Sequence, residues 1–236
     1  MTATSAQKAP TSARAQATYA TNLFAAGQVD ASLAVLDQAI ENIGSTRPLL
    51  LLQKMVLSCH AQRLELTEFQ RLANILGDTT YDPRQINIYS ALTEAVATKR
   101  CPAIPATALA SLFQTMLKTS PNSNPKDLRY AQLNYFLGYV RASSNMPSAA
   151  VDAFEASLAS RRSASSAMAM AAVLAENRHQ AEALHLSEIA LQILERDGTG
   201  AYSSSMVNES DIRKFRETVR AESERPTTDD SNGAAQ

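Results

Sequence analysis

The 236-residue chain is poor in glycine and proline, with 7 and 9 residues of each type. So few turn-forming residues leave little material for the frequent turns of an all-β protein. Good helix formers, chiefly Ala, Leu, Gln and Glu, dominate the central stretch instead. The hydrophobic fraction of 45% is usual for a folded protein that buries a core as one or two domains. The composition therefore predicts an all-α protein.

The sequence also lacks an excess of charge and any long apolar run. The formal net charge is −1, whereas proteins that bind nucleic acid usually carry a basic excess on one face, so we expect no nucleic-acid partner. The longest apolar runs are Leu49–Leu52 and Ala167–Ala175, well short of the roughly 20 residues that span a bilayer. The sequence therefore predicts no membrane span in this chain.

The first sixteen residues contain no apolar segment of the kind found in secretory signals. We therefore expect a cytoplasmic protein by default, and a periplasmic one if the chain is an excised domain.

Known catalytic motifs are missing as well. The sequence has no GxGxxG, GxxxxGK[ST], HExxH or GxSxG pattern. Its three histidines, His60, His179 and His185, do not have the spacing of a metal site, and we expect solvent-facing or hydrogen-bonded side chains. We predict no cofactor, no metal and no enzymatic activity, although these absences leave open a catalytic site built from residues distant in sequence.

Cysteine is almost absent, since Cys59 and Cys101 are the only two. They lie on different predicted helices and form no CxxC motif. Because free cysteine is commonly buried, we expect two small buried side chains. A disulfide and a reactive thiol remain the alternatives, which the sequence alone does not separate.

Apolar residues recur with the period of a helix along most of the chain. The pattern, with breaks at Gly, Pro and capping residues, predicts about eleven helices joined by short loops. Asp82-Pro83 and Pro48 have the form of helix starts, and Thr67 with Gln70 resembles a capping box. Short loops force neighbouring helices to be antiparallel, so we expect helical hairpins stacked in series as an α-solenoid.

The same signals divide the chain into regions. We predict a disordered tail at 1–12, a helical-hairpin region at 13–118, a linker at 119–126, a repeat region at 127–196, a loop at 197–207, a helix at 208–223 and a disordered tail at 224–236.

A near-repeat links residues 134–158 to residues 167–191. Ala150 and Ala183 are 33 residues apart, and so are Ser157 and Ala190. A fixed period near this value is typical of proteins built from stacked helix pairs.

Residues 134–162 resemble a tetratricopeptide repeat (TPR), whose pattern is W-x2-L-G-x2-Y, then A-x3-F, then P. Leu137-Gly138 and Ala150-x3-Phe154 match this pattern, while Asn134, Arg141 and Arg162 replace its Trp, Tyr and Pro. The resemblance implies that Gly138 and Ala150 lie where the two helices approach closely.

Two further segments resemble the repeat more weakly. Residues 16–43 have Tyr19-Ala20 and Ser32-x3-Leu36 in the matching places, and the segment around Ala183 and Ala190 has Ser187 in place of Phe. The stretch 47–126 reads as helical hairpins without a legible repeat.

In the TPR family, the first helix of each pair lines a groove that holds a partner's peptide. The match places groove residues at Gln132, Tyr135, Phe136 and Tyr139, then at Arg14, Ala17, Thr18 and Thr21, then at Ser165, Met168, Ala169 and Ala172.

Arg14 is the only basic residue among these positions, which disfavours the Lys–Asn–Arg clamp of the chaperone-binding branch. Tyr135 and Tyr139 would form an aromatic ridge suited to a partner segment. The alternative is that these rings belong to the core.

The predicted helix at 208–223 has a narrow apolar stripe, Ile212, Phe215 and Val219, among charged residues. It either seals the end of the repeat array or docks a partner or a membrane surface.

We therefore expect a non-enzymatic TPR-like scaffold that binds another protein or peptide. The alternative is the soluble, periplasmic TPR-like tail of a bacterial membrane glycosyltransferase or polysaccharide polymerase or ligase.

Overall fold

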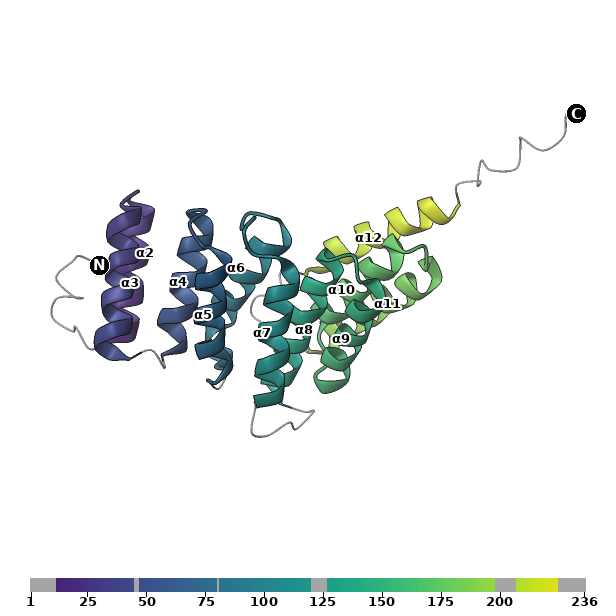
Figure 1. The fold of residues 1–236 in the computed structure, drawn as a ribbon. Coiled ribbons are helices and arrows are strands. Elements are labelled where there is room, and N and C mark those ends of the chain that lie inside the picture. The colour runs from purple at the N-terminus through teal and green to yellow at the C-terminus, as the bar shows by residue number, and fades with distance from the viewer. Residues whose placement is uncertain (1–11, 45–46, 80, 120–126, 198–206, 225–236) are drawn as a thin grey trace, which may run out of the picture. The chain divides into compact units, whose positions relative to one another are not determined.

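The computed structural model describes residues 12–44, 47–79, 81–119, 127–197 and 207–224. These residues form eleven α-helices and one 3₁₀ helix, with no strand among them (Figure 1). The prediction of an all-α protein is confirmed. Most of the predicted tails at 1–12 and 224–236, of the linker at 119–126 and of the loop at 197–207 lies outside the described residues.

The helices of the described residues include two predicted starts, at Pro48 and, after Asp82, at Pro83. Their bounds are α2 Ala13–Ala25, α3 Val29–Ile43, α4 Pro48–His60, α5 Leu66–Gly77, η1 Pro83–Gln85, α6 Ile86–Ala97, α7 Ala106–Thr119, α8 Leu128–Ser143, α9 Pro147–Ser160, α10 Ala164–Glu176, α11 Gln180–Asp197 and α12 Glu209–Ser223.

Side-chain caps explain several of the helix starts. Asp82, Asp127, Ser163 and Asn208 each accept a hydrogen bond from a backbone N–H in the first turn of the following helix. The predicted capping box at Thr67 is wrong, because α5 already begins at Leu66 and its cap residue makes no side-chain hydrogen bond.

Five hairpins share one device at their turns. The residue that ends the turn after each first helix has a left-handed backbone, with φ between 57° and 77°. Backbone hydrogen bonds reach back from these turns to the last carbonyls of the preceding helix. The residues are Gly27 after α2, Gln62 after α4, Lys99 after α6, Asn145 after α8 and Arg178 after α10. The stretch 47–126 therefore contains two hairpins, α4–α5 and α6–α7, built like the others.

The chain divides into two compact units, residues 1–161 and residues 162–236. In the first unit the hairpins stack in order, and each first helix packs against the next through the series α2, α4, α6 and α8. In the same unit α5 packs on α7, and α7 packs on α8. The division falls between the hairpins α8–α9 and α10–α11, and not at the segment 119–126.

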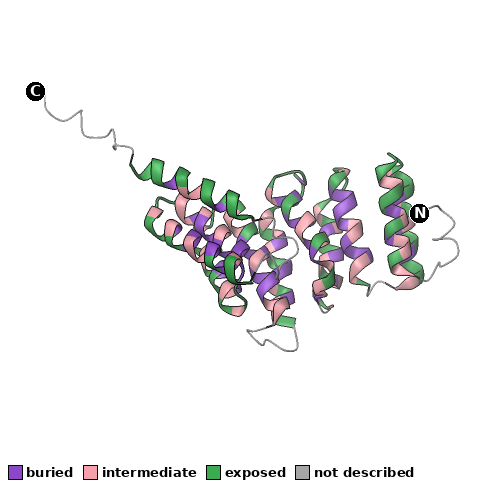
Figure 2. Ribbon diagram, turned by 180° about the vertical axis from the view of Figure 1, so that it is seen from behind, coloured by how far each residue is buried: buried purple, intermediate pink, exposed green. Residues whose placement is uncertain are grey.

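The core of the first unit contains an aromatic cluster. The Tyr89 ring lies 4.6 Å from Tyr81, 6.4 Å from Phe113 and 6.3 Å from Phe136, measured between ring centroids. These rings come from the segment before η1 and from α6, α7 and α8, so the cluster joins the third and fourth hairpins. Figure 2 shows the buried residues on the facing sides of these helices.

The expected repeat-packing residues all lie buried. In α8 and α9 they are Leu137, Gly138, Ala150 and Phe154, and in α11 they are Ala183 and Ala190. The close contact at Gly138 is with the Phe154 ring, because a β-carbon added to this glycine would lie 2.7 Å from the ring. Serine fills the crossing elsewhere: Ser32 Oγ donates to the Ala20 carbonyl at 2.7 Å and links α3 to α2.

The second unit consists of the hairpin α10–α11 and of α12, which packs along α11. Ile212 and Val219 are buried, as the stripe predicts, and the rest of α12 is largely exposed (Figure 2). An ion pair between Arg216 and Glu188 also joins α12 to α11. The apolar stripe of α12 is therefore occupied within its own unit.

Cys59 and Cys101 are bonded to each other in a disulfide, with their Cα atoms 5.1 Å apart. Both are buried, as expected, but they are not free thiols. The bond joins the end of α4 to the connector between α6 and α7. Within the ranges that the structure describes, no helix combines the length and the apolar character needed to cross a membrane.

Candidate functional site

A cleft in two adjoining parts lies on the row of first helices in the first unit. One part, with a volume of about 540 Å³, lies between α2, α4 and the start of α6. The other, of about 600 Å³, lies at the N-terminal ends of α2, α4, η1 and α8. Five residues line both parts, namely Arg14, Leu49, Asp82, Arg84 and Gln85. We call the two parts together the first-helix cleft.

The structure places Arg14, Ala17, Thr18 and Thr21, which the weak N-terminal match assigned to a groove, on the wall of this cleft. Ala17 is buried, whereas Arg14 and Thr18 are exposed. Thr21 Oγ1 donates to the Ala17 carbonyl at 2.9 Å and accepts from Gln53 Nε2 of α4 at 3.1 Å. This wall therefore combines small side chains with hydrogen-bonding groups that α2 and α4 hold in place.

Two of the cleft's arginines are held by neighbouring carboxylates. Arg84 binds Asp82 through Nε at 3.0 Å and Nη2 at 3.1 Å, and Arg129 binds Asp127 through Nε at 2.9 Å. Each aspartate also accepts from the backbone N–H of its arginine. The arginine side-chain hydrogen bonds lower the pKa values of Asp82 and Asp127, so both carboxyls are ionised at neutral pH.

The other two arginines have no such partner. Arg14 on α2 and Arg47 before α4 are exposed, and neither forms an ion pair with any residue that the structure describes. A buried acceptor in the cleft is likewise unused, because Gln85 Oε1 is out of reach of solvent and has no hydrogen-bond donor. The cleft therefore presents free donors on its rim and an unpaired amide in its wall.

The four groove residues expected on α8 are only partly accessible. Gln132 is 3% exposed and accepts a hydrogen bond from the Tyr81 hydroxyl at 2.8 Å, and Phe136 is 2% exposed among the core rings. Their burial has a physical cause, since α6, α7 and α9 all pack against α8 and cover much of its surface. Gln132 and Phe136 are thus core residues, which corrects their assignment to a groove.

The tyrosine ridge is also divided. Tyr135 lies against Phe154 and Phe136, with ring centroids 5.9 Å and 5.7 Å away, and burial raises its pKa to about 12. Tyr139, in contrast, is 42% exposed. Tyr139 is therefore the member of the ridge that a partner can reach.

On α10 the structure buries Ser165 and leaves Met168, Ala169 and Ala172 half-buried. These small side chains add no charge and little hydrogen-bonding capacity to the surface of the second unit.

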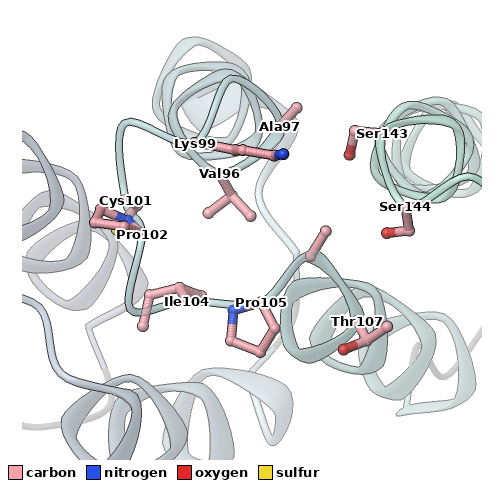
Figure 3. A pocket seen from close by; sticks show the side chains of 11 residues that line it. Val96, Ala97, Lys99, Cys101, Pro102, Ile104, Pro105, Thr107, Ser143 and Ser144 are labelled. Carbon is pink, nitrogen blue, oxygen red and sulfur yellow. The ribbon is translucent and has the colours of Figure 1, made fainter.

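A second, smaller cleft of about 350 Å³ lies beside the connector between α6 and α7 (Figure 3). Val96, Ile104 and Pro105 make its walls apolar. Lys99 extends across the opening toward the end of α8, where Ser143 and Ser144 lie. The lining includes no carboxylate and no histidine.

The sequence predicted the α2 wall of the first-helix cleft but not its other lining residues. Arg47, Arg84 and Arg129 come from loops and helix starts in the stretch without a legible repeat and at the start of α8. Each precedes or opens a helix, and nothing in its local pattern marks it as a groove residue. In the described part of the chain, no three His, Cys, Asp or Glu side chains cluster closely enough to hold a metal ion.

Serial antiparallel hairpins, small residues at the helix crossings and a cleft on the first helices define a TPR-like helical repeat protein. No protein-family model matches the sequence, and no curated protein matches it.

Three solved structures illustrate the similarity of fold. The TPR protein TTC0263 of Thermus thermophilus is 19% identical, with 89% of this chain and 100% of that chain covered and a TM-score of 0.49. PilF of Pseudomonas aeruginosa is 16% identical, with 89% and 87% covered and a TM-score of 0.49. YrrB, described as a TPR protein with an unusual peptide-binding site, is 15% identical, with 82% and 92% covered and a TM-score of 0.43. Similarity at this level does not extend to function.

Proposed function

We propose that this chain is a non-enzymatic TPR-like scaffold that binds an extended segment of another protein in the first-helix cleft. The observation that carries the proposal is the cleft itself, which runs over α2, α4 and the start of α6 in three successive hairpins. A partner lying there would contact all three hairpins at once.

The lining suits an extended peptide. Thr21, Gln53 and Gln85 offer hydrogen-bond donors and acceptors to a peptide backbone, and Leu49 and Ile88 offer apolar surface to its side chains. The small residue Ala17 leaves room for the backbone to approach α2.

A blocking substitution tests this proposal. Thr18→Trp places a large ring at an exposed position of the cleft wall, and Gln38→Trp places the same ring at an exposed position on α3 that lines neither part of the cleft. Proteins captured by the wild type are quantified by mass spectrometry against both variants, after circular dichroism shows that each variant is folded. We expect Thr18→Trp to lose partners that Gln38→Trp retains. Equal capture by the two variants would exclude the cleft as the binding site.

We further propose that Tyr139 contacts the partner. Tyr135 is unsuitable for a test, because its ring packs against three others and its removal would destabilise the fold by about 3 kcal/mol. Tyr139→Ala removes an exposed ring at little cost to stability. Partner capture should fall with Tyr139→Ala, and unchanged capture would remove Tyr139 from the site.

A second candidate function is favoured by the disulfide. Disulfides persist in oxidising compartments such as the periplasm and are rare in the cytosol. The bond between Cys59 and Cys101 supports the periplasmic setting of the alternative, in which this chain is a TPR-like region of a bacterial membrane glycosyltransferase or polysaccharide polymerase or ligase. Trapping thiols in intact cells with a heavy maleimide decides the redox state: an unmodified pair supports this alternative, and two modified cysteines count against it.

A further inference from the structure

We propose that the segment bound in the first-helix cleft is acidic, with Asp or Glu side chains held by Arg14 and Arg47. This inference rests on the proposed function, because it names the chemistry of the partner at the same site.

Positive charge is concentrated in the part of the cleft at the helix starts. Four arginines from four different elements line the part of the cleft at the helix starts, against two carboxylates, Asp82 in the lining and Asp127 bound to Arg129. The four are Arg14 of α2, Arg47 before α4, Arg84 of η1 and Arg129 of α8. Because the whole chain has a net charge of −1, this local excess of positive charge is a property of the cleft and not of the protein.

Two of these four arginines are free to bind a ligand. Asp82 and Asp127 already occupy Arg84 and Arg129. Arg14 and Arg47 have no ion pair in the described structure, so their guanidinium donors are open to a ligand. A guanidinium presents its donors as a planar fork that matches the two oxygens of a carboxylate.

Helix N-termini add positive charge to the same part of the cleft. The helices α2 and α4 both begin at this part of the cleft, and neither has an acidic residue at its N-cap or in its first turn, whereas Asp127 caps α8. The positive ends of the α2 and α4 dipoles therefore add to the arginine charges. The hydrogen-bonding side chains of Thr21 and Gln53 in the adjoining part of the cleft favour a peptide over a simple anion.

The rest of the surface argues for a peptide over a nucleic acid. The chain carries 23 acidic residues against 22 basic ones, so it has no overall positive charge to attract a long polyanion. A short acidic segment needs only the cleft.

Fluorescence anisotropy with the full chain tests the proposal. The probe is a fluorescein-labelled peptide of about twelve residues that alternates Glu with Ala or Gly and has an amidated C-terminus; its control replaces every Glu with Gln. At about 50 mM salt we expect the acidic peptide to bind at least about tenfold more tightly than the control, and to weaken by about tenfold or more at 200 mM salt. Equal binding of the two peptides would overturn the proposal.

Matched variants locate the binding. Arg14→Gln/Arg47→Gln removes two positive charges from the cleft, and Lys214→Gln/Arg220→Gln removes two from the exposed face of α12. The cleft variant should bind the acidic peptide about tenfold more weakly than the wild type, and the α12 variant should bind it as the wild type does. If both variants lost affinity for the acidic peptide equally, binding would depend only on the net charge of the protein, and the proposal would be overturned.

Two further probes identify the chemistry of the ligand. Restoring a free C-terminal carboxylate to the Gln peptide should not restore binding, and a restored affinity would assign the arginines to a chain end instead of acidic side chains. A single-stranded oligonucleotide of equal charge should bind more weakly than the acidic peptide, and tighter binding would overturn the proposal in favour of a nucleic acid.

The outcome separates this inference from the proposed function. If Thr18→Trp loses its partners while Arg14→Gln/Arg47→Gln keeps them, the cleft binds a protein but not through acidic side chains. If neither variant loses partners, the cleft itself is not the site.

Discussion

At Gly138, the helices α8 and α9 approach so closely that no other residue fits without a shift. An added β-carbon would lie 2.7 to 2.9 Å from three atoms of the Phe154 ring. Gly77 has a looser environment, since its β-carbon would meet a Thr115 methyl group at 3.0 Å. The same residue type therefore has different costs of substitution at the two sites.

Gly138→Ala should destabilise the protein by about 1–2 kcal/mol. Overpacking against a buried ring costs about 1–3 kcal/mol, and the better helix propensity of alanine offsets up to about 1 kcal/mol. Gly77→Ala, where the neighbouring methyl group can move, should be within about 1 kcal/mol of neutral. Urea unfolding of both variants measures the difference. A Gly138→Ala protein as stable as the wild type would show that the α8–α9 crossing is looser than described.

The Glu68 carboxylate makes the stability of the fold depend on pH. It receives hydrogen bonds from Arg71 at 2.7 Å and from Lys54 at 2.7 Å, and Lys54 also pairs with Asp37 of α3. The hydrogen bond from Arg71, with the help of Lys54, lowers the pKa of Glu68 from 4.5 to about 2. This network joins α3, α4 and α5.

Because the folded-state pKa is the lower one, Glu68 stabilises the fold fully above about pH 4.5 and loses this effect as the pH falls toward 2. Glu68→Gln should therefore be less stable than the wild type by about 1 kcal/mol at neutral pH, since the pair is partly exposed. The difference in stability between Glu68→Gln and the wild type should disappear near pH 2. Urea midpoints at several pH values check this, with Glu217→Gln on the exposed face of α12 as the control. A gap that stayed constant with pH would contradict it.

At the scale of the element, five hairpins share a left-handed turn that the sequence signals at only some of them. The turn position is occupied by Gly27 and Asn145, which favour this conformation, but also by Gln62, Lys99 and Arg178, which do not signal it. The helix starts at Pro48 and Asp82-Pro83 were nevertheless predictable, because prolines and capping residues are local signals. Burial around α8 was not, since it depends on three neighbouring helices.

The disulfide between Cys59 and Cys101 should stabilise the first unit. It closes a loop over a sequence separation of 42 residues, for which loop-closure entropy gives an upper value of about 4 kcal/mol. We expect reduction, or the variant Cys59→Ala/Cys101→Ala, to lower the melting temperature in non-reducing buffer. Alkylation in denaturant followed by mass spectrometry should detect no free thiol before reduction and two after it. Two free thiols before reduction would contradict the bond.

At the scale of the whole molecule, the chain behaves as two units whose boundary falls between Arg161 and Arg162. Both arginines are exposed, and the backbone at Arg161 is extended after α9 ends. Each unit makes its contacts chiefly within itself. The boundary therefore combines accessible tryptic sites with a backbone outside any helix.

Among the sites in the described residues, limited digestion with trypsin should cut first after Arg161 or Arg162, because a protease needs extended, accessible backbone. Intact-mass analysis identifies the fragments, and circular dichroism should show that the fragment ending there stays helical. Arg161→Gln/Arg162→Gln should abolish this cleavage. Early cuts within the described helices, with none at this boundary, would argue that the division does not exist in solution.

The amino-acid sequence by itself determined the helical class, the helix starts at Pro48 and Asp82-Pro83 and the small residues at the α8–α9 crossing, because these depend on local periodicity, capping and spacing. Only the tertiary structure decided which face of α8 is buried, that Cys59 meets Cys101, and that Arg14, Arg47, Arg84 and Arg129 share one cleft. These features join residues far apart in the sequence, and their contacts depend on how the hairpins pack, which no local pattern encodes.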